Sequence, residues 1–522
     1  MKEDWKRILR RGTRGKEERK EEREEKGELQ VPEAREENET RGREIERYAV
    51  NEPYAAIRII NSSPPLYEVV EPNLSSGERE LLKEIKNHLY ETIDVSFARV
   101  TEPDEFLREK VEALVGDLSM EISPERLDTM MYYVRRDFIG YGKLDPIIND
   151  KMAEDISADG PGIPLYVYHR KYGSIETNVQ FAKPELDAMI YKLAQRAGRH
   201  ISMAKPLLDA SLPTKDRLQL SIGHEVTTRG STFTIRKFKE IPITPIELID
   251  YGTFSVEMIA YLWMAVGNGS NILISGGTAS GKTTVLNAVS MFIPPESKIV
   301  SIEDTREINL MHQNWIPAVT REAEEGGRSI EMFDLLRTAL RQRPEYILVG
   351  EVRGREAYTL FQAMATGHIT LSTVHADSAD AVVKRLTKPP IDIPLMLLDS
   401  LDIIPIQRSV KVKNKRVRRC TQIMEVTGVD FDNETLKTNE LFSWRPDEFV
   451  FKKESNVFAE IMDKLNLSEH ELSEEFARRV RILEWMRKRG MNDFESLSKI
   501  IFEYSINPEA VEKRIRDERG YK

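Results

Sequence analysis

Cysteine is almost absent from this sequence: its 522 residues include one, Cys420. A single cysteine forms no disulfide within the chain and supplies no four-cysteine zinc site. A small fold held together by disulfides or by a structural metal is therefore excluded. Because disulfides persist in oxidising compartments, their exclusion favours a chain that works in the cytosol.

Long apolar runs are also lacking. The two most apolar stretches, residues 258–266 and 391–406, are too short to cross a bilayer or carry Asp392, Asp399 and Asp402, whose charges are costly in lipid. The first residues have no apolar core like that of a signal peptide. We therefore expect no membrane-spanning helix and a chain that stays in the compartment where it is made.

Charge, in contrast, is abundant: 77 Lys and Arg stand against 87 Asp and Glu, a formal net charge of −10. Residues 1–47 consist mainly of Lys, Arg and Glu with scattered large apolar side chains, too few to offset the entropy cost of ordering. We expect a disordered charged tail, with bases enriched before about residue 20 and acids after it. A lone charged helix, or contact with a partner or a membrane surface, remains an alternative.

The rest of the chain is long enough for several folded units. In residues 48–138, two short strands around a turn precede apolar residues at helical spacing, which predicts a mainly helical subdomain. Residues 139–240 mix alternating strand patterns with one helix and predict an α+β domain. Pro242, Pro245 and Gly252 predict a stiff linker, and a hinge, over residues 241–252.

Strands and helices alternate in residues 253–429, which predicts an α/β domain with a parallel sheet and crossover helices. A hairpin pattern closes this domain near residues 403–429. Residues 430–522 are expected to form a C-terminal helical region.

A phosphate-binding loop is the clearest motif. Residues 276–283 fit the pattern GxxxxGK[ST] between an expected strand at 272–275 and a helix from Lys282. Glycines let backbone N–H groups turn toward phosphate oxygens, and the helix start adds a favourable dipole. Lys282 is expected to contact the β and γ phosphates of ATP, and the Thr283 hydroxyl to bind Mg²⁺. The predicted nucleotide-binding residues are Gly276, Gly277, Thr278, Ala279, Ser280, Gly281, Lys282, Thr283 and Thr284.

Two acidic sites follow apolar strands: Glu303 with Asp304, and Glu351. Strand ends of a parallel sheet face the crevice that holds the nucleotide, so either site can reach Mg²⁺ or the attacking water. A Walker B strand usually ends in Asp-Glu, but Gly350 occupies the Asp position here. This departure assigns more of the metal binding to Glu303 or Asp304, and a helix-capping role stays open for each carboxylate.

Three further polar residues are candidates. His375 ends another expected strand, where a hydrogen bond can sense the γ phosphate; a surface or core histidine is the alternative. Arg337 and Arg341 are an i,i+4 pair on one face near the end of a helix. They serve catalysis or complement the helix dipole.

Together these motifs resemble those of the type II/IV secretion and type IV pilus assembly ATPases. The similarity rests on GGTASGKTT, SIEDTRE, LRTALRQRPEYILVGEVRGREA and GHITLSTVHA, which occur in that family's order. It extends over about residues 48–427 and is greatest to the archaeal branch that serves pili, secretion and the archaellum. The four-cysteine zinc module of bacterial extension motors is missing.

The resemblance implies a RecA-like ATPase domain preceded by the helical subdomain and a PAS-like α+β domain, assembled as a homo-hexamer. It also implies that Arg217, Arg229 and Arg236 close on the phosphates bound by an adjacent subunit, where guanidinium groups stabilise transition-state charge. Solvated arginines are the alternative.

We therefore expect a Mg²⁺-dependent ATP-hydrolysing motor in the cytoplasm, at the inner face of the membrane, that delivers work to a polytopic membrane platform protein. Alternatives are an archaellum rotation motor, a conjugation or retraction motor, and a nucleotide-switched scaffold with little turnover. The basic run at residues 411–419 lacks interleaved aromatics, so nucleic-acid binding is not expected.

Overall fold

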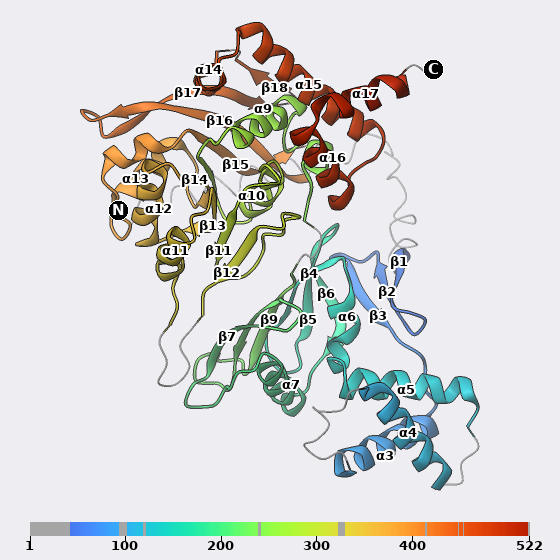
Figure 1. The fold of residues 1–522 in the computed structure, drawn as a ribbon. Coiled ribbons are helices and arrows are strands. Elements are labelled where there is room, and N and C mark those ends of the chain that lie inside the picture. Colours follow the sequence, from blue (N-terminus) through green and yellow to red (C-terminus); the bar gives the residue numbers. More distant parts are fainter. Residues whose placement is uncertain are drawn as a thin grey trace, which may run out of the picture. The chain divides into compact units, whose positions relative to one another are not determined.

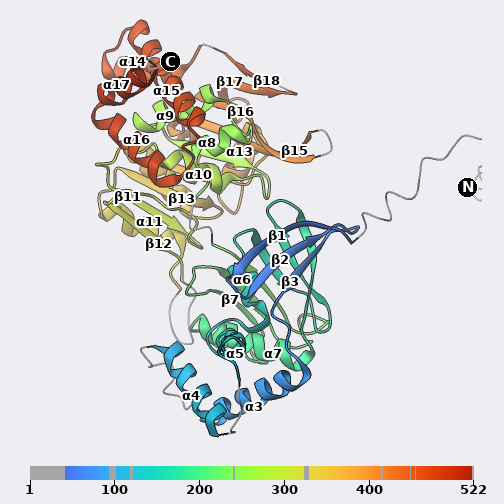
Figure 2. The ribbon, with the colours of Figure 1, turned by 90° about the vertical axis from the view of Figure 1, so that its right-hand side faces the viewer.

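The computed structural model describes residues 42–92, 102–117, 122–238, 242–321, 329–412, 415–446, 448–452 and 454–519. Its contacts divide the chain into two units (Figures 1 and 2). The first contains residues 1–192, 200–208 and 219–235; the second contains residues 193–199, 209–218 and 236–522. Most of the predicted charged tail lies outside the described residues.

The N-terminal part of the fold contains a nine-stranded sheet with the order β1-β2-β3-β6-β5-β4-β9-β8-β7. Its strands are β1 (Glu44–Asn51), β2 (Ala55–Ile60), β3 (Leu66–Val70), β4 (Ala153–Ala158), β5 (Pro164–His169), β6 (Gly173–Gln180), β7 (Leu207–Ser211), β8 (Arg217–Ser221) and β9 (Thr232–Arg236). The helices of this part are α3 (Ser76–Thr92), α4 (Pro103–Asp117), α5 (Pro124–Phe138), α6 (Asp145–Asn149) and α7 (Lys183–Arg196). Helices α3 to α5 enclose a small core of their own that includes Ile85, Leu107 and Val134.

Two sequence boundaries differ from this arrangement. Residues 44–47, assigned above to the charged tail, form the first half of β1, which pairs antiparallel with β2. Strand β3 pairs in parallel with β6, with Leu66 opposite Glu176. The first three strands thus extend the sheet of the α+β region, because alternate residues such as Ile57 and Ile59 are fully buried.

The second unit is built on a sheet with the order β12-β11-β13-β14-β10-β15-β16-β17-β18. Its parallel part comprises β10 (Ile272–Gly276), β11 (Ile299–Glu303), β12 (Trp315–Val319), β13 (Tyr346–Val352) and β14 (Ile369–Val374). All five residues of β10 and of β11 are buried, as expected for central strands covered on both faces. The predicted α/β fold with a parallel sheet is thus observed.

The remaining strands form an antiparallel extension: β15 (Ile403–Val412), β16 (Lys415–Asp430), β17 (Thr435–Arg445) and β18 (Glu448–Phe451). Strand β15 runs parallel to β10, with Ile272 opposite Ile403, and then turns back as β16. The expected hairpin is therefore present and lies beside the strand that leads into the phosphate loop.

Helices cover both faces of this sheet (Figure 1). One core includes residues of α8 (Pro245–Asp250), α9 (Val256–Gly267), α10 (Lys282–Ser290), α14 (Asn456–Leu465), α15 (Glu469–Lys488), α16 (Phe494–Ile506) and α17 (Pro508–Arg519). The other core includes residues of α11 (Met332–Arg341), α12 (Glu356–Ala365) and α13 (Ala379–Thr387). No helix among the described residues combines the length and apolarity needed to cross a bilayer.

Part of the expected linker at residues 241–252 is helix α8. Thr244 caps it through a capping box with Glu247, and Pro245 occupies its first turn. Ile246, Leu248 and Ile249 are buried in the core of the second unit. Pro245 therefore starts a packed helix within the expected linker. The other domain boundaries expected from the sequence stay a prediction.

Candidate functional site

The phosphate loop connects β10 to α10 as predicted. Gly281 has φ +91°, a left-handed conformation that favours glycine, immediately before the helix. A Cβ at Gly276 would lie 2.3 Å from the carbonyl oxygen of Gln407, so only glycine fits there. The two glycines are thus required by the local backbone and by its packing against β15.

Lys282 is 7% exposed at the start of α10, and its Nζ donates a hydrogen bond to the carbonyl oxygen of Gly277 over 3.1 Å. The same Nζ lies 3.4 Å from both ring nitrogens of His375. Burial lowers the pKa of Lys282, and the nearby charge of Arg353 lowers it further, against the opposing effect of Glu351. A phosphate anion would relieve this unfavourable environment, so the ammonium group is suited to bind one.

His375 lies directly after β14 and links the lysine to Glu351. Its Nε2 is 3.1 Å from Oε1 of Glu351. Burial and the charge of Lys282 lower the pKa of His375, so the imidazole is neutral at pH 7. Two predicted candidates from separate strands thus meet at the phosphate loop.

Glu351 also accepts a hydrogen bond from Arg353, with 2.5 Å between Nη2 and Oε2. The other terminal nitrogen of Arg353 is 3.5 Å from Oδ2 of Asp304. Burial alone would raise the pKa of Glu351, but the bond and charge of Arg353, with His375 and Lys282, leave it lowered. Glu351 is therefore ionised across the physiological range.

Glu303 has the opposite environment. It is 2% exposed, and its Oε1 accepts the backbone N–H groups of Glu307 and Ile308 at 2.9 and 3.0 Å. Its Oε2 has no hydrogen-bond partner among the described residues. Burial raises the pKa of Glu303 to about 7, against the two N–H groups, which lower it. One carboxylate oxygen is thus free to take a ligand or a proton.

Gly350 makes room for the buried side chain of Glu303. A Cβ at residue 350 would lie 3.2 Å from Cγ of Glu303, tighter than most van der Waals contacts. The absence of a side chain, the departure noted in the sequence, therefore leaves room for the Glu303 side chain. The sequence assigned the vacant acidic role to Glu303 or Asp304; the structure places Glu303 against that position.

The residues that would hold Mg²⁺ fit that ion in kind. Thr283 is the second residue of α10. Oε2 of Glu303 is buried without a hydrogen-bond partner among the described residues, and Asp304 directly follows β11. The described residues contain no group of three or more His, Cys, Asp or Glu side chains arranged for a metal. Hydroxyl and carboxylate oxygens are the kinds of protein ligand that Mg²⁺ accepts, together with waters and substrate phosphate oxygens.

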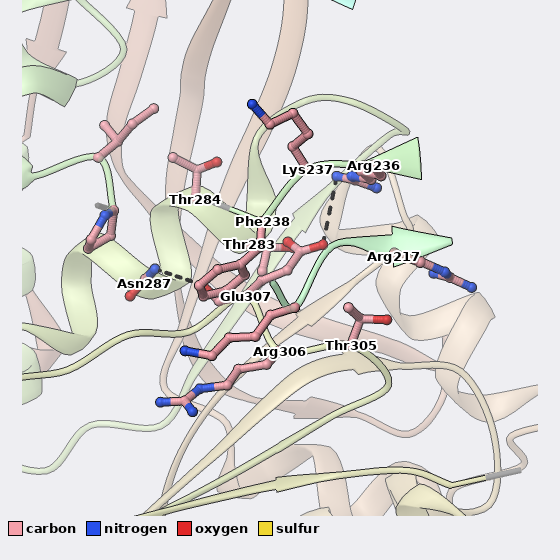
Figure 3. Close-up of a pocket in the computed structure, with 13 residues that line it drawn as sticks. Arg217, Arg236, Lys237, Phe238, Thr283, Thr284, Asn287, Thr305, Arg306 and Glu307 are labelled. Carbon is pink, nitrogen blue, oxygen red and sulfur yellow. Dashed lines mark hydrogen bonds and ion pairs between the residues drawn. The ribbon is translucent and has the colours of Figure 1, made fainter. Parts of the chain in front are cut away.

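Basic residues line a pocket beside the phosphate loop in the second unit (Figure 3). Arg236 lies 3.7 Å from Oε1 of Glu307, and the backbone oxygen of Glu307 accepts from the side chain of Asn287 over 3.1 Å. Lys215, Arg217, Arg236, Lys237, Phe238, Pro242, Ile243, Thr283, Thr284, Asn287, Thr305, Arg306 and Glu307 line this pocket. Arg217 and Arg236 therefore share a pocket with Thr283 of their own chain. Their action on the nucleotide of an adjacent subunit stays a prediction.

Three predicted arginines lie elsewhere. Arg229 is exposed in the first unit, where its side chain approaches Gly160. Arg337 and Arg341 are exposed on α11, and the guanidinium of Arg337 is 5.6 Å from the ring centre of Phe333. Contacts among the described residues do not join these three to the phosphate loop. Their catalytic roles stay a prediction.

Sequence reasoning missed two arginines that contact the site. Arg353, two residues after Glu351, holds that carboxylate, and its spacing was the available signal because i and i+2 share a face in extended chain. Arg418 donates its Nε–H to the carbonyl oxygen of Ala279 over 3.1 Å. It lies in the basic run that was considered only for nucleic acid.

The fold and the glycine-rich loop define an α/β protein of the phosphate-loop class. The family model described as type II/IV secretion system protein matches residues 142–489, and the chain belongs to that family. An uncharacterized protein of Methanocaldococcus jannaschii is 38% identical over 466 residues, which cover 84% of each chain.

Two other matches come from bacteria. The type IV secretion system protein PtlH of Bordetella pertussis is 32% identical over 268 residues, 47% of this chain and 78% of that protein. The X-ray structure of the Legionella pneumophila ATPase DotB is similar with a TM-score of 0.37 and 18% identity, covering 74% of this chain and 97% of that one. At that TM-score the structural likeness adds nothing to the family assignment.

Proposed function

We propose that the chain is a Mg²⁺-dependent ATPase that powers a type IV pilus-like or type II secretion-like membrane machine. The observation that carries this proposal is the contact series Lys282, His375, Glu351 at the mouth of the phosphate loop. A cation, a neutral imidazole and an ionised carboxylate thus lie together beside the phosphate loop, which supports a role for them at the terminal phosphate of a bound nucleotide.

Each side chain has a distinct part in ATP hydrolysis. Lys282 and the N–H groups of residues 277–283 bind the phosphate oxygens. Thr283, with Glu303 or Asp304, would hold Mg²⁺, which neutralises phosphate charge when bound. Nε2 of His375 lies 3.1 Å from Oε1 of Glu351, and the imidazole also lies 3.4 Å from Nζ of Lys282, so His375 is positioned to respond to the γ phosphate.

The two glutamates differ in pKa and in hydrogen-bond partners, and these differences separate a proton acceptor from a group that acts through its charge. Where Asp304 is the carboxylate that holds Mg²⁺, Glu303, with a pKa of about 7 and a free Oε2, is suited to take a proton from the attacking water. Glu351 has both oxygens engaged, by Arg353 and by His375, and remains ionised. It orients those groups and the water rather than storing the proton.

Arg217 and Arg236 supply positive charge from the pocket beside Thr283. Guanidinium groups there would stabilise the charge that builds on the transferring phosphoryl group. We further propose a homo-hexamer at the cytoplasmic face of the membrane, working on a polytopic platform protein. Membership of the type II/IV secretion system family supports this assembly.

The test is steady-state phosphate release from ATP and Mg²⁺ by the full chain. Wild type should turn over, and Lys282→Ala should remove turnover and weaken ATP binding, because the charge at the β and γ phosphates is lost. ATP binding without turnover in wild type would replace the motor with a nucleotide-switched scaffold. Equal phosphate release by the variant would reject the site.

A further inference from the structure

The hairpin of β15 and β16 carries arginines that contact both loops of the candidate site. The two strands pair antiparallel, with Arg408 opposite Arg419 and Ser409 opposite Arg418. Figure 2 shows this hairpin extending away from the helices that cover the sheet. We call residues 408–412 and 415–419 the basic ribbon.

Arg418 lies along the outer side of the phosphate loop. Its Nε–H donates to the carbonyl oxygen of Ala279 over 3.1 Å, and its Cδ would be 3.3 Å from a Cβ at Gly281. Ala279 has φ +58°, a conformation that non-glycine residues adopt rarely. The bond to Arg418 is thus made at the carbonyl of a loop residue in a left-handed conformation.

The planarity of the peptide unit gives this bond a consequence inside the loop. In a trans peptide the carbonyl of one residue and the N–H of the next point in opposite directions. Because the Ala279 carbonyl points outward to Arg418, the Ser280 N–H points inward, toward the Gly277 carbonyl oxygen, from which its nitrogen is 3.4 Å away. Arg418 therefore orients the N–H of a loop residue, and N–H groups of this loop are the donors proposed to bind phosphate.

Arg408, on the partner strand, makes a second contact of the same kind. Its Nη2 donates to the carbonyl oxygen of Asp377 over 2.8 Å, two residues after His375. Oδ1 of Asp377 would lie 3.2 Å from a Cβ at Gly277, at the other end of the phosphate loop. One ribbon therefore holds main-chain oxygens of both segments that surround Lys282.

We propose that Arg418 and Arg408 are positioning residues, through which the basic ribbon sets the geometry of the phosphate loop and of the segment after His375. The inference rests on the proposed nucleotide binding at this loop. Neither guanidinium needs to contact the nucleotide, since each acts on a backbone carbonyl. A change in the ribbon would alter nucleotide affinity without changing any residue of the loop.

The experiment measures ADP affinity of the full chain by isothermal titration calorimetry, so that no hydrolysis is involved. Arg418→Met keeps most of the alkyl chain and removes the donor, and Arg418→Lys keeps a donor and the charge. Arg416→Met is the matched control: it lies two residues away on the same strand and is also exposed, but its Nε bonds to Ser409 Oγ within the ribbon.

Arg418→Met should weaken ADP binding about three- to tenfold, the range expected for the loss of one ordinary intramolecular hydrogen bond. Arg418→Lys should recover much of that affinity, and Arg416→Met should bind as wild type does. The thermal unfolding midpoint should stay unchanged in all three, whereas a merely structural role would move the midpoint and leave affinity alone.

Wild-type affinity in Arg418→Met would overturn the inference, as would an equal loss in Arg416→Met, which would mean that charge alone matters. If Arg418→Met fails to fold, Arg418→Lys and Arg408→Lys, measured against wild type, decide the question through the same titration. Failure of wild type itself to bind ADP, with Lys282→Ala indistinguishable from it, would reject the proposed function instead.

Discussion

Nε2 of His375 lies 3.1 Å from Oε1 of Glu351, which joins the ends of two neighbouring parallel strands in front of the phosphate loop. The imidazole is also within 3.4 Å of Lys282 Nζ. Loss of the terminal phosphate of a bound nucleotide would therefore change the hydrogen bonds and charge interactions of Lys282, His375 and Glu351 together. The following predictions test this arrangement and the groups that support it.

The two glutamates should respond differently to amide substitution. Glu351→Gln and Glu303→Gln should each retain ATP binding and lower turnover, by about 10²-fold or more, because a group that orients or deprotonates water is neutralised. The pH dependence of kcat/KM separates their roles. Residual activity of Glu351→Gln should still rise with pH through about 7, the pKa of Glu303, whereas that of Glu303→Gln should not. A rise lost only in Glu351→Gln would assign proton transfer to Glu351.

Glu303 should also make stability depend on pH. Its pKa in the folded chain is about 7, above the ordinary value of 4.5, so the folded state binds more protons than the unfolded state between these values. Unfolding free energy should therefore fall as pH rises from about 4.5 to about 7, by about 3 kcal/mol from this group. Glu303→Gln removes this loss, so its unfolding midpoint should exceed that of wild type at pH 8 and approach it at pH 5.

The exposed neighbour Asp304 gives the control for this measurement. Asp304→Asn alters a carboxylate one residue away without neutralising a buried group. A pH-independent difference between wild type and Glu303→Gln, or the same pH dependence in Asp304→Asn, would contradict the origin proposed for the effect.

Gly350→Ala should disturb Glu303 specifically. The added Cβ would lie 3.2 Å from Cγ of Glu303, so the side chain must move, with an expected cost of about 1–2 kcal/mol in stability and a loss of turnover. Gly116→Ala on α4, where a Cβ meets nothing within 4 Å, is the matched control: it should leave turnover unchanged and should not lower stability, because alanine favours a helix more than glycine does. Normal turnover in Gly350→Ala would show that Glu303 tolerates the crowding or is not needed.

Mixing two inactive variants tests whether the site is completed within one chain. Lys282→Ala keeps Arg217 but lacks the phosphate-binding lysine, and Arg217→Ala has the reverse defect. If Arg217 acts in the pocket that it shares with Thr283 of its own chain, mixed oligomers should recover no activity. Recovery on mixing, checked with two affinity tags to show that the variants co-assemble, would restore the arrangement across subunits that the sequence suggested.

The sequence by itself determined the class of the site. The spacing of residues 276–283 between an apolar strand and a helix specifies a phosphate loop, because backbone N–H groups can converge on an anion only where glycines permit the turn. Alternation of strands and helices after residue 253 likewise specified a parallel sheet, since such strands require crossover connections. These signals are local and need no knowledge of distant contacts.

Only the tertiary structure distinguished the roles of the candidate site residues. Glu303 and Glu351 look alike in sequence, and burial of one and the contact of the other with Arg353 separate their pKa values. Arg418 reaches Ala279 from 139 positions along the chain, and the helix that replaces part of the expected linker depends on the core into which Ile246 and Leu248 pack. Such effects depend on desolvation and on contacts between distant segments, which folding creates and residue spacing alone does not specify.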